Sequence, residues 1–202
     1  FQSAVLRFGM EVKMQYTSHY QSPLGGILLA ADDKGLTGLW FEGQKYFAHG
    51  LGRERERKAL CERSSFHEEK EIPVLKETKR WLDLYFSGKE PDFTVPIHLI
   101  GTDFQKEVWR ILCQIPYGKT MTYGEIAARL AARKGLAHMS AQAVGGAVGH
   151  NKISILVPCH RVVGVDGSLT GYAGGMDKKV KLLTLEKVDM QFLYVPKKGT
   201  AL

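Results

Sequence analysis

The chain has 202 residues, of which 44% are hydrophobic and 24% charged, an ordinary composition for a globular protein. No apolar run approaches the roughly 20 residues of a membrane-spanning helix, so we expect no membrane partner and a cytoplasmic location. The net charge of +7 lies in the second half: residues 1–100 carry 14 Lys/Arg and 14 Asp/Glu, whereas residues 101–202 carry 14 and 7. This asymmetry indicates a polyanionic partner for one part of the chain only.

The first elements in chain order form a small antiparallel sheet. Residues 1–9, "FQSAVLRFG", read as a tag remnant and are left out of the fold. Turn signals at Pro23 and at 32–35 separate two apolar runs, 27–31 and 36–41. Such runs between turns predict neighbouring strands.

An amphipathic helix completes the first half. Residues 53–71 carry charges of both signs in balance, which is typical of a solvated helix or loop. Residues 73–88 place apolar side chains near helical spacing, with a proline at the start and a glycine at the end. Residues 89–101 then indicate an extended linker, so we expect an α/β N-terminal domain over residues 12–92.

Three short helices follow in the basic half. They are predicted over residues 102–118, 121–135 and 139–151. Thr122 and Glu125 have the spacing of a capping box, and Ser140 is suited to cap the third helix.

The last part of the chain predicts a strand, a turn and a helix. The stretch "ISILVPCHRVVG" over 153–164 indicates a strand, Asp166 and Gly167 a turn, and residues 177–188 an amphipathic helix. Three helices followed by a hairpin are typical of a winged helix-turn-helix, which predicts a DNA-binding domain over residues 101–188. The expected fold class is therefore α+β, followed by a flexible tail over 190–202.

The third of these helices offers almost only small side chains, with Gln142 as its one amide. Helices that read base sequence usually present Arg, Asn or Gln to the base edges. Small side chains instead let the helix backbone come close to a duplex, which favours sequence-independent binding through shape and phosphates.

Cys159 and His160 stand side by side in an apolar run, and several explanations fit. A buried structural thiol is the usual state of a lone cysteine in a strand. A metal site is disfavoured because neighbouring strand side chains point to opposite faces, and a disulfide does not suit the expected compartment. A nucleophilic thiol needs a base, which His160 could supply through a bend at Pro158, with Glu186 orienting the imidazole.

"PCHRVVG", together with "GYAGG", "LLTLE", "IPYGKTMTYGEIA" and "AVGGAVGHN", resembles the O6-alkylguanine-DNA alkyltransferase family. The match is dense over 102–188 and loose over the first 100 residues. The resemblance implies a ribonuclease-H-like N-terminal domain before a winged-helix domain. It also implies a monomer without cofactor or metal that binds double-stranded DNA in the minor groove and flips out O6-methylguanine. The alkyl group then moves irreversibly to a cysteine, and activity on O4-methylthymine stays open.

The resemblance implies a role for each site residue, carried over by position. Cys159 would accept the alkyl group, and His160, oriented by Glu186, would deprotonate it through a water. Tyr123 would help to rotate the nucleotide and to protonate the leaving base. The DNA- and base-binding residues implied in the same way are Ser140, Gln142, Asn151, Val157, Tyr172 and Ala173.

The sequence also departs from the family pattern. The family usually carries an arginine where Gln142 stands, so we expect weaker DNA binding or slower base extrusion with the chemistry intact. An insertion-like "AARKGLAH" adds Arg133, Lys134 and His138, which would recover phosphate contacts. The alternative function is a non-catalytic binder of alkylated DNA, but such proteins replace the cysteine that this chain retains at Cys159.

Overall fold

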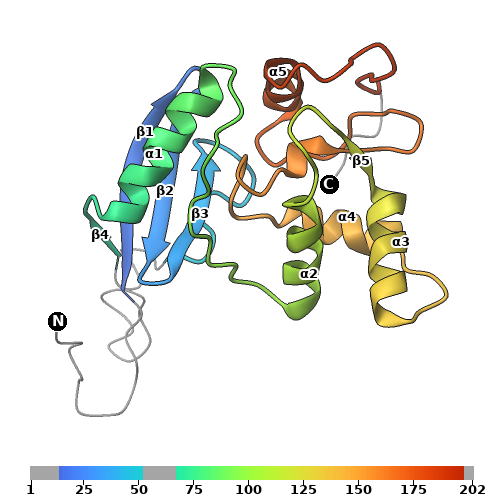
Figure 1. The fold of residues 1–202 in the computed structure, drawn as a ribbon, viewed down its shortest axis with the longest axis horizontal. Helices are drawn as coiled ribbons and strands as arrows, with labels where there is room; N and C mark the ends of the chain where they lie inside the picture. Colours follow the sequence, from blue (N-terminus) through green and yellow to red (C-terminus); the bar gives the residue numbers. More distant parts are fainter. Residues whose placement is uncertain (1–13, 52–66, 198–202) are drawn as a thin grey trace.

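The computed structural model describes residues 14–51 and 67–197. Within them, a sheet covered by a helix stands beside a helical region that carries the second half of the chain (Figure 1). None of the described helices is long and apolar enough to cross a membrane. Residues 1–9 and most of the charged 53–71 segment lie outside the described residues, so what we expected of them stays a prediction.

The N-terminal sheet has the strand order β3-β2-β1-β4. β1 (Gln15–Ser22), β2 (Gly25–Asp32) and β3 (Gly35–Phe41) form an antiparallel meander, which confirms the two predicted strands. β4 (His67–Glu69) pairs in parallel with β1, so the end of the charged segment is a strand rather than the expected helix or loop.

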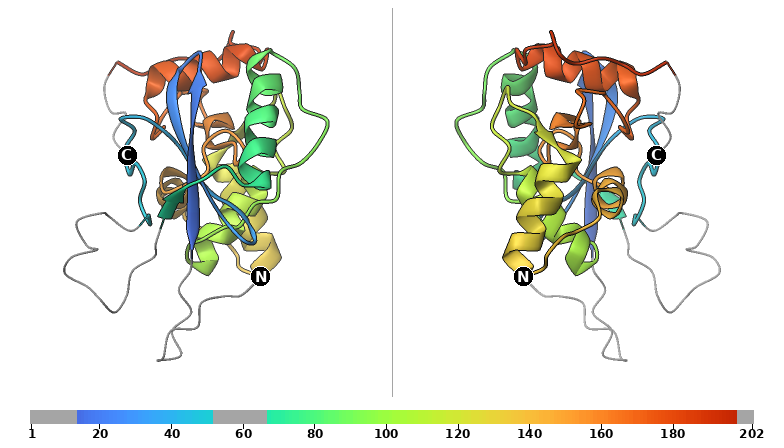
Figure 2. Two further views of the ribbon diagram at one scale, coloured as in Figure 1. Left: turned by 90° about the vertical axis from the view of Figure 1, so that its left-hand side faces the viewer. Right: turned by 90° about the vertical axis from the view of Figure 1, so that its right-hand side faces the viewer.

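α1 (Pro73–Phe86) lies along one face of this sheet, as the side views show (Figure 2). Its buried side chains include Leu75, Leu82 and Tyr85, in agreement with the predicted amphipathic spacing. On the opposite face, Trp40 packs against Leu51 and its neighbours, which follow β3. β3 is therefore buried on both faces, which explains its continuous apolar sequence.

Helices dominate the second half of the chain. Its regular elements are α2 (Asp103–Leu112), β5 (Met121–Thr122), α3 (Tyr123–Lys134), α4 (Ala141–Gly149), β6 (Val162–Val163) and α5 (Met176–Leu185). α2 ends at Leu112 instead of continuing toward 118. Thr122 and Glu125 form the expected capping box, and Ser140 Oγ accepts a hydrogen bond from the Ala143 N–H, as a cap should.

The predicted strand over 153–164 is wrong except near its end. Ile155 has a φ of 69°, and Cys159–Arg161 form a 3₁₀ turn, so only the two residues of β6 belong to a ladder. Pro158 has no N–H to donate to a neighbouring strand, which disfavours a continuous ladder. Cys159 and His160 are both buried at this turn, the first against Asn151 and the second against Glu186.

The predicted hairpin after this segment is reduced to a turn. The Gly164 N–H donates to the Ser168 carbonyl at 2.8 Å, and β6 pairs in parallel with β5 rather than with a following strand. The chain end lies beside the turn, where the Leu169 N–H donates to the Tyr194 carbonyl at 2.8 Å. Residues 190–195 are therefore held against the turn, where we expected a flexible tail.

The two halves of the chain share one core. Leu39 of β3 belongs to the same buried cluster as Val108 of α2. The Leu39 N–H donates to the Lys152 carbonyl at 2.8 Å, and the Leu39 carbonyl accepts from the Ser154 N–H at 3.0 Å. The edge of the N-terminal sheet thus positions the segment that leads to Cys159.

Candidate active site

Cys159 begins the 3₁₀ turn and is only 4% exposed. Its Sγ accepts a hydrogen bond from Nδ2 of Asn151 at 3.1 Å. The same amide donates to the Val157 carbonyl at 2.8 Å, and Asn151 Oδ1 accepts from the Ile153 N–H at 3.0 Å. Asn151 therefore closes the loop that carries the thiol, and its donor favours a thiolate on the sulfur.

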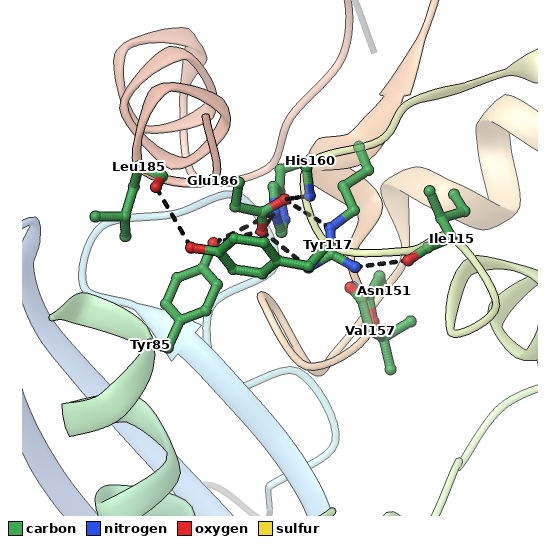
Figure 3. Close-up of polar contacts among 10 residues, drawn as sticks. Tyr85, Ile115, Tyr117, Asn151, Val157, His160, Leu185 and Glu186 are labelled. Atoms are coloured by element: carbon green, nitrogen blue, oxygen red, sulfur yellow. Dashed lines mark hydrogen bonds and ion pairs between the residues drawn. The ribbon is translucent and has the colours of Figure 1, made fainter. Parts of the chain in front are cut away.

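His160 and Glu186 form a buried pair. Glu186 is the C-cap of α5, and its Oε1 lies 2.7 Å from His160 Nε2 (Figure 3). The ionised carboxylate can only accept, so Nε2 carries the proton and Nδ1 keeps a free lone pair. Nδ1 is buried and has no hydrogen-bond partner among the described residues, so it is available to accept a proton within the site.

Arg161 holds the same carboxylate through a bidentate pair. Its Nε lies 2.8 Å from Glu186 Oε2, and its Nη2 lies 2.9 Å from Oε1. Its Nη1 donates to the Ile115 carbonyl at 2.6 Å. No role for Arg161 was expected from the sequence, although a charged residue inside an apolar run is itself a signal of a buried partner.

Burial and charge set the resting protonation of the site. Burial raises the pKa of Glu186, but the hydrogen bonds and charges of His160 and Arg161 outweigh it and bring the pKa to about 2. Burial lowers the pKa of His160 against the opposing effect of Glu186. Burial also raises the pKa of the Cys159 thiol, against the Asn151 hydrogen bond and the charge of Lys179. At neutral pH the site therefore holds a thiol, a neutral imidazole and a carboxylate.

Lys179 is a fully buried cation that the sequence did not single out. Its Nζ donates to the carbonyls of Val162 and Thr170, at 2.6 Å each. Burial lowers the pKa of Lys179 to about 8, whereas the charge of a Cys159 thiolate raises it. Its position was an available signal, because it shares the buried face of α5 with Leu182.

Tyr123 and Tyr172 lie close enough to Cys159 for its charge to affect them. Tyr123 begins α3, and its hydroxyl donates to the Thr170 carbonyl at 3.3 Å. Burial raises the pKa of Tyr123, so the phenol keeps its proton at neutral pH. The Tyr172 ring is buried edge to face with the His160 ring, at 6.4 Å between centroids.

A cavity of about 110 Å³ lies between α4 and the 171–173 segment. Residues that line it include Gly145, Gly146, Gly149, Tyr172 and Ala173. A wall of glycines leaves room for a flat ring to lie against the helix backbone. Ser140 and Gln142 are exposed in the first turn of α4, so the structure leaves these two predicted residues on the surface, apart from the buried cluster of Cys159.

Two family models match the chain, one for each half. Residues 15–99 match "6-O-methylguanine DNA methyltransferase, ribonuclease-like domain", and residues 103–188 match "6-O-methylguanine DNA methyltransferase, DNA binding domain". The chain belongs to the 6-O-methylguanine DNA methyltransferase family. The resemblance carried by the Cys–His motif is confirmed, and membership of the methyltransferase family extends over the first half, where the sequence match looked loose.

Relatives in this methyltransferase family are similar over most of the chain. The methylated-DNA--protein-cysteine methyltransferase of Methanosarcina mazei is 44% identical over 171 residues, covering 85% of this chain and 96% of the relative. The Haemophilus influenzae protein of the same name is 37% identical over 174 residues, covering 86% and 87%. The crystal structure of Mycobacterium tuberculosis OGT in complex with DNA is similar with a TM-score of 0.67 at 39% identity, covering 86% of this chain and 92% of that one. The arrangement of the two halves is therefore similar to that in the solved OGT structure.

Proposed function

We propose that this protein repairs O6-alkylguanine in DNA by direct reversal, moving the alkyl group to Cys159 in one irreversible turnover. The observation that carries the proposal is the buried Cys159 thiol, whose sulfur accepts a hydrogen bond from the Asn151 amide. The next residue, His160, is paired with Glu186 through Nε2, and its Nδ1 has no hydrogen-bond partner among the described residues. Relatives that share most of the chain are named methylated-DNA--protein-cysteine methyltransferase, which supports the same chemistry here.

Proton transfer prepares the nucleophile. The Cys159 thiol gives its proton to His160 Nδ1 through one water, and the Glu186 carboxylate stabilises the imidazolium that results. The sulfur then attacks the alkyl carbon, a C–S bond forms, and the bond from that carbon to guanine O6 breaks. The electron pair stays on the base, which takes up a proton from the Tyr123 phenol. The phenol regains a proton from solvent, and the His160 imidazolium releases the former thiol proton to solvent, so no net proton is gained or lost.

The product explains why the protein acts once. The thioether on Cys159 has no acidic proton, and nothing in the reaction expels it again, so one chain removes one alkyl group. A thiol that is 4% exposed does not reach a base inside the stack, so the base must leave the duplex. The cavity beside Tyr172 is the site that we assign to the flipped base.

We propose that α4 meets the minor groove of double-stranded DNA without sequence preference, within a winged helix-turn-helix domain over 101–188 that follows the N-terminal domain over 12–92. The small side chains of α4 support a close approach of its backbone, with Gln142 exposed to fill the gap left by the base. Arg133 donates to Gln114, and Lys134 is paired with Glu107, so phosphate contacts by these two cations would compete with internal bonds. One chain suffices, because thiol and cavity lie in the same chain.

Intact-protein mass spectrometry tests the proposal. A duplex with a single O6-methylguanine should add one methyl group to the wild-type chain and stop at one equivalent. The matched Cys159→Ser variant should bind the same duplex and gain no mass, because the alcohol is a far weaker nucleophile than the thiolate. Wild-type protein that binds the lesion without gaining mass would establish a non-catalytic binder and refute the transfer.

A further inference from the structure

Tyr85 brings helix α1 of the N-terminal half into direct contact with the carboxylate of Glu186. Its hydroxyl donates to Glu186 Oε1 at 2.7 Å, across 101 positions of sequence (Figure 3). The hydroxyl also lies 3.5 Å from His160 Nε2, which shares the same carboxylate oxygen. The tyrosine side chain is fully buried. From the sequence it was one of several apolar residues on a helix face, with no further role.

The ring of Tyr85 is fixed by its neighbours. Trp81 stacks on it at 5.3 Å between centroids with 11° between the planes, and Phe86 and Tyr117 pack edge to face at 5.4 and 6.1 Å. Burial, followed by the charge of Glu186, raises the pKa of Tyr85 well above its usual value. The hydroxyl therefore stays protonated and is held in one place as a donor.

We infer that Tyr85 is a positioning residue for alkyl transfer, acting on His160 through Glu186; this inference rests on the proposed function. Three donors converge on Glu186 Oε1: the Tyr85 hydroxyl, His160 Nε2 and Arg161 Nη2. The phenol fixes this oxygen opposite Nε2, which keeps the proton on Nε2 and leaves the Nδ1 lone pair free to accept a proton. It also takes a share of the carboxylate charge, so the imidazole remains neutral until the thiol proton arrives.

The conservative substitution Tyr85→Phe removes the hydroxyl and keeps the ring stacking. We expect alkyl transfer to slow by about tenfold, the lower end of what one hydrogen bond to a charged group contributes. The acid limb of the rate–pH profile should move to higher pH, because a carboxylate with one donor less stabilises the His160 imidazolium more strongly. Glu186, Arg161 and Lys179, the other charged groups that act on His160, are unchanged in this variant. A purely structural role would lower the amount of active protein without moving the limb.

Tyr117→Phe is the matched control. The Tyr117 hydroxyl donates to the Leu185 carbonyl at 3.3 Å, beside the same cluster but not on Glu186, so this variant should keep the wild-type rate and profile. Replacing Tyr85 by 3-fluorotyrosine provides a second variant, with a stronger donor of nearly the same shape. It should move the acid limb to lower pH, opposite in sign to Tyr85→Phe, and it keeps the inference testable if the phenylalanine variant does not fold.

A double-mutant cycle tests whether Tyr85 acts through Glu186. In a Glu186→Gln background, Tyr85→Phe should change the rate by less than about twofold, because the charge that it acts on is already gone. Rates are measured in single turnover on an O6-methylguanine duplex and normalised to the fraction of each variant that becomes methylated. Provided that the wild type transfers the methyl group, either of two results overturns the inference. The first is an acid limb that does not move in either Tyr85 variant, and the second is a cycle in which the rate losses of Tyr85→Phe and Glu186→Gln are fully additive in free energy. A wild type that transfers no methyl group overturns the proposed function instead.

Discussion

Replacement of Lys179 by methionine should separate the stability of the protein from its reactivity. Lys179 is fully buried, and its Nζ bonds to the carbonyls of Val162 and Thr170. Methionine has a similar length and flexibility without the charge, so it fills the same space. The Thr170 carbonyl keeps the hydrogen bond from the Tyr123 hydroxyl, so the carbonyl that mainly loses its donor is that of Val162.

Two opposing contributions nearly cancel in the free energy of unfolding. A buried carbonyl left without its donor costs about 1–3 kcal/mol. Against this, the pKa of Lys179 is lowered from 10.5 to about 8, and at about 1.36 kcal/mol per pKa unit the buried charge costs roughly 3 kcal/mol at pH 7. We therefore expect the unfolding midpoint of Lys179→Met at pH 7 to stay near that of the wild type or to rise by up to about 8 °C, since 1 kcal/mol corresponds to about 2–4 °C in a chain of this size.

The balance depends on pH in a defined direction. Between about pH 8 and pH 10.5 the unfolded chain holds the Lys179 proton and the folded chain has lost it, so the wild type gains stability as the pH rises. Below that window both states hold the proton, and the full cost is present. Because Lys179→Met lacks this titration, its stability relative to the wild type should fall by about 2–3 kcal/mol from roughly pH 7 to pH 10.

Reactivity should change more than stability. The Lys179 charge lowers the pKa of the Cys159 thiol, so its removal disfavours the thiolate. An interaction of about 1–2 kcal/mol between two unit charges at an effective dielectric constant of about 20 corresponds to roughly 5–30-fold in rate. Single-turnover transfer and urea unfolding at two pH values measure both quantities. An unchanged transfer rate, or a stability loss above about 2 kcal/mol at neutral pH, would refute this reasoning, since the opposing costs would not then cancel.

Three further changes test other parts of the site. Gln142→Arg should tighten binding to undamaged duplex and make that binding more dependent on salt. Titrations at two salt concentrations measure both effects. An unchanged salt dependence would contradict a DNA contact at this residue. Gly146→Ala should raise the free energy of unfolding by about 0.5–1 kcal/mol, because no atom of the described residues outside its own helix lies within 4 Å of the added Cβ. It should nevertheless slow transfer, because the methyl group enters the cavity, and a stabilised variant with an unchanged rate would show that the base does not bind in this cavity. Gly118 has a φ of +70°, and a Cβ at this position would lie 2.8 Å from the Glu186 carbonyl oxygen. Gly118→Ala should therefore lower the free energy of unfolding by at least about 1–2 kcal/mol in denaturant and slow transfer. A variant with wild-type stability would contradict that strain.

Short-range signals predicted the elements that carry their own capping or turn residues. The capping box of Thr122 and Glu125 starts α3 where the sequence placed it, and Ser140 caps α4. The turn between β2 and β3 is closed by Asp32, whose side chain accepts from the N–H of Lys34 two residues on. These bonds join residues two or three positions apart, so the sequence contains both partners side by side.

The features that the sequence did not predict depend on contacts whose two partners are not recognisable as a pair in the sequence. The apolar 153–164 segment resembled a strand, yet it meets β3 through a single bridge at Ile153 and then turns, with the Asn151 amide bonded to its Val157 carbonyl in place of a ladder. The partner of Tyr85 lies 101 positions away, and a tyrosine on an apolar helix face has no local mark of what its hydroxyl binds. The Cys–His motif and its partner Glu186 could be recognised from the residues, whereas the roles of Arg161, Lys179 and Tyr85 became visible only in three dimensions.

The resting site protects its nucleophile and prepares it at the same time. A thiol that is 4% exposed, with a pKa raised by burial, is a poor target for oxidants and stray electrophiles, which matters in a protein that reacts once. The same burial shields the sulfur from bulk water that would otherwise stabilise a thiolate, so fixed groups must stabilise its charge: the Asn151 amide and the Lys179 ammonium. His160 in turn depends on Glu186, whose charge Arg161 and Tyr85 hold in place. Since these groups are buried away from bulk water, the loss of a single hydroxyl on α1 should be measurable in the rate at which sulfur takes the alkyl group.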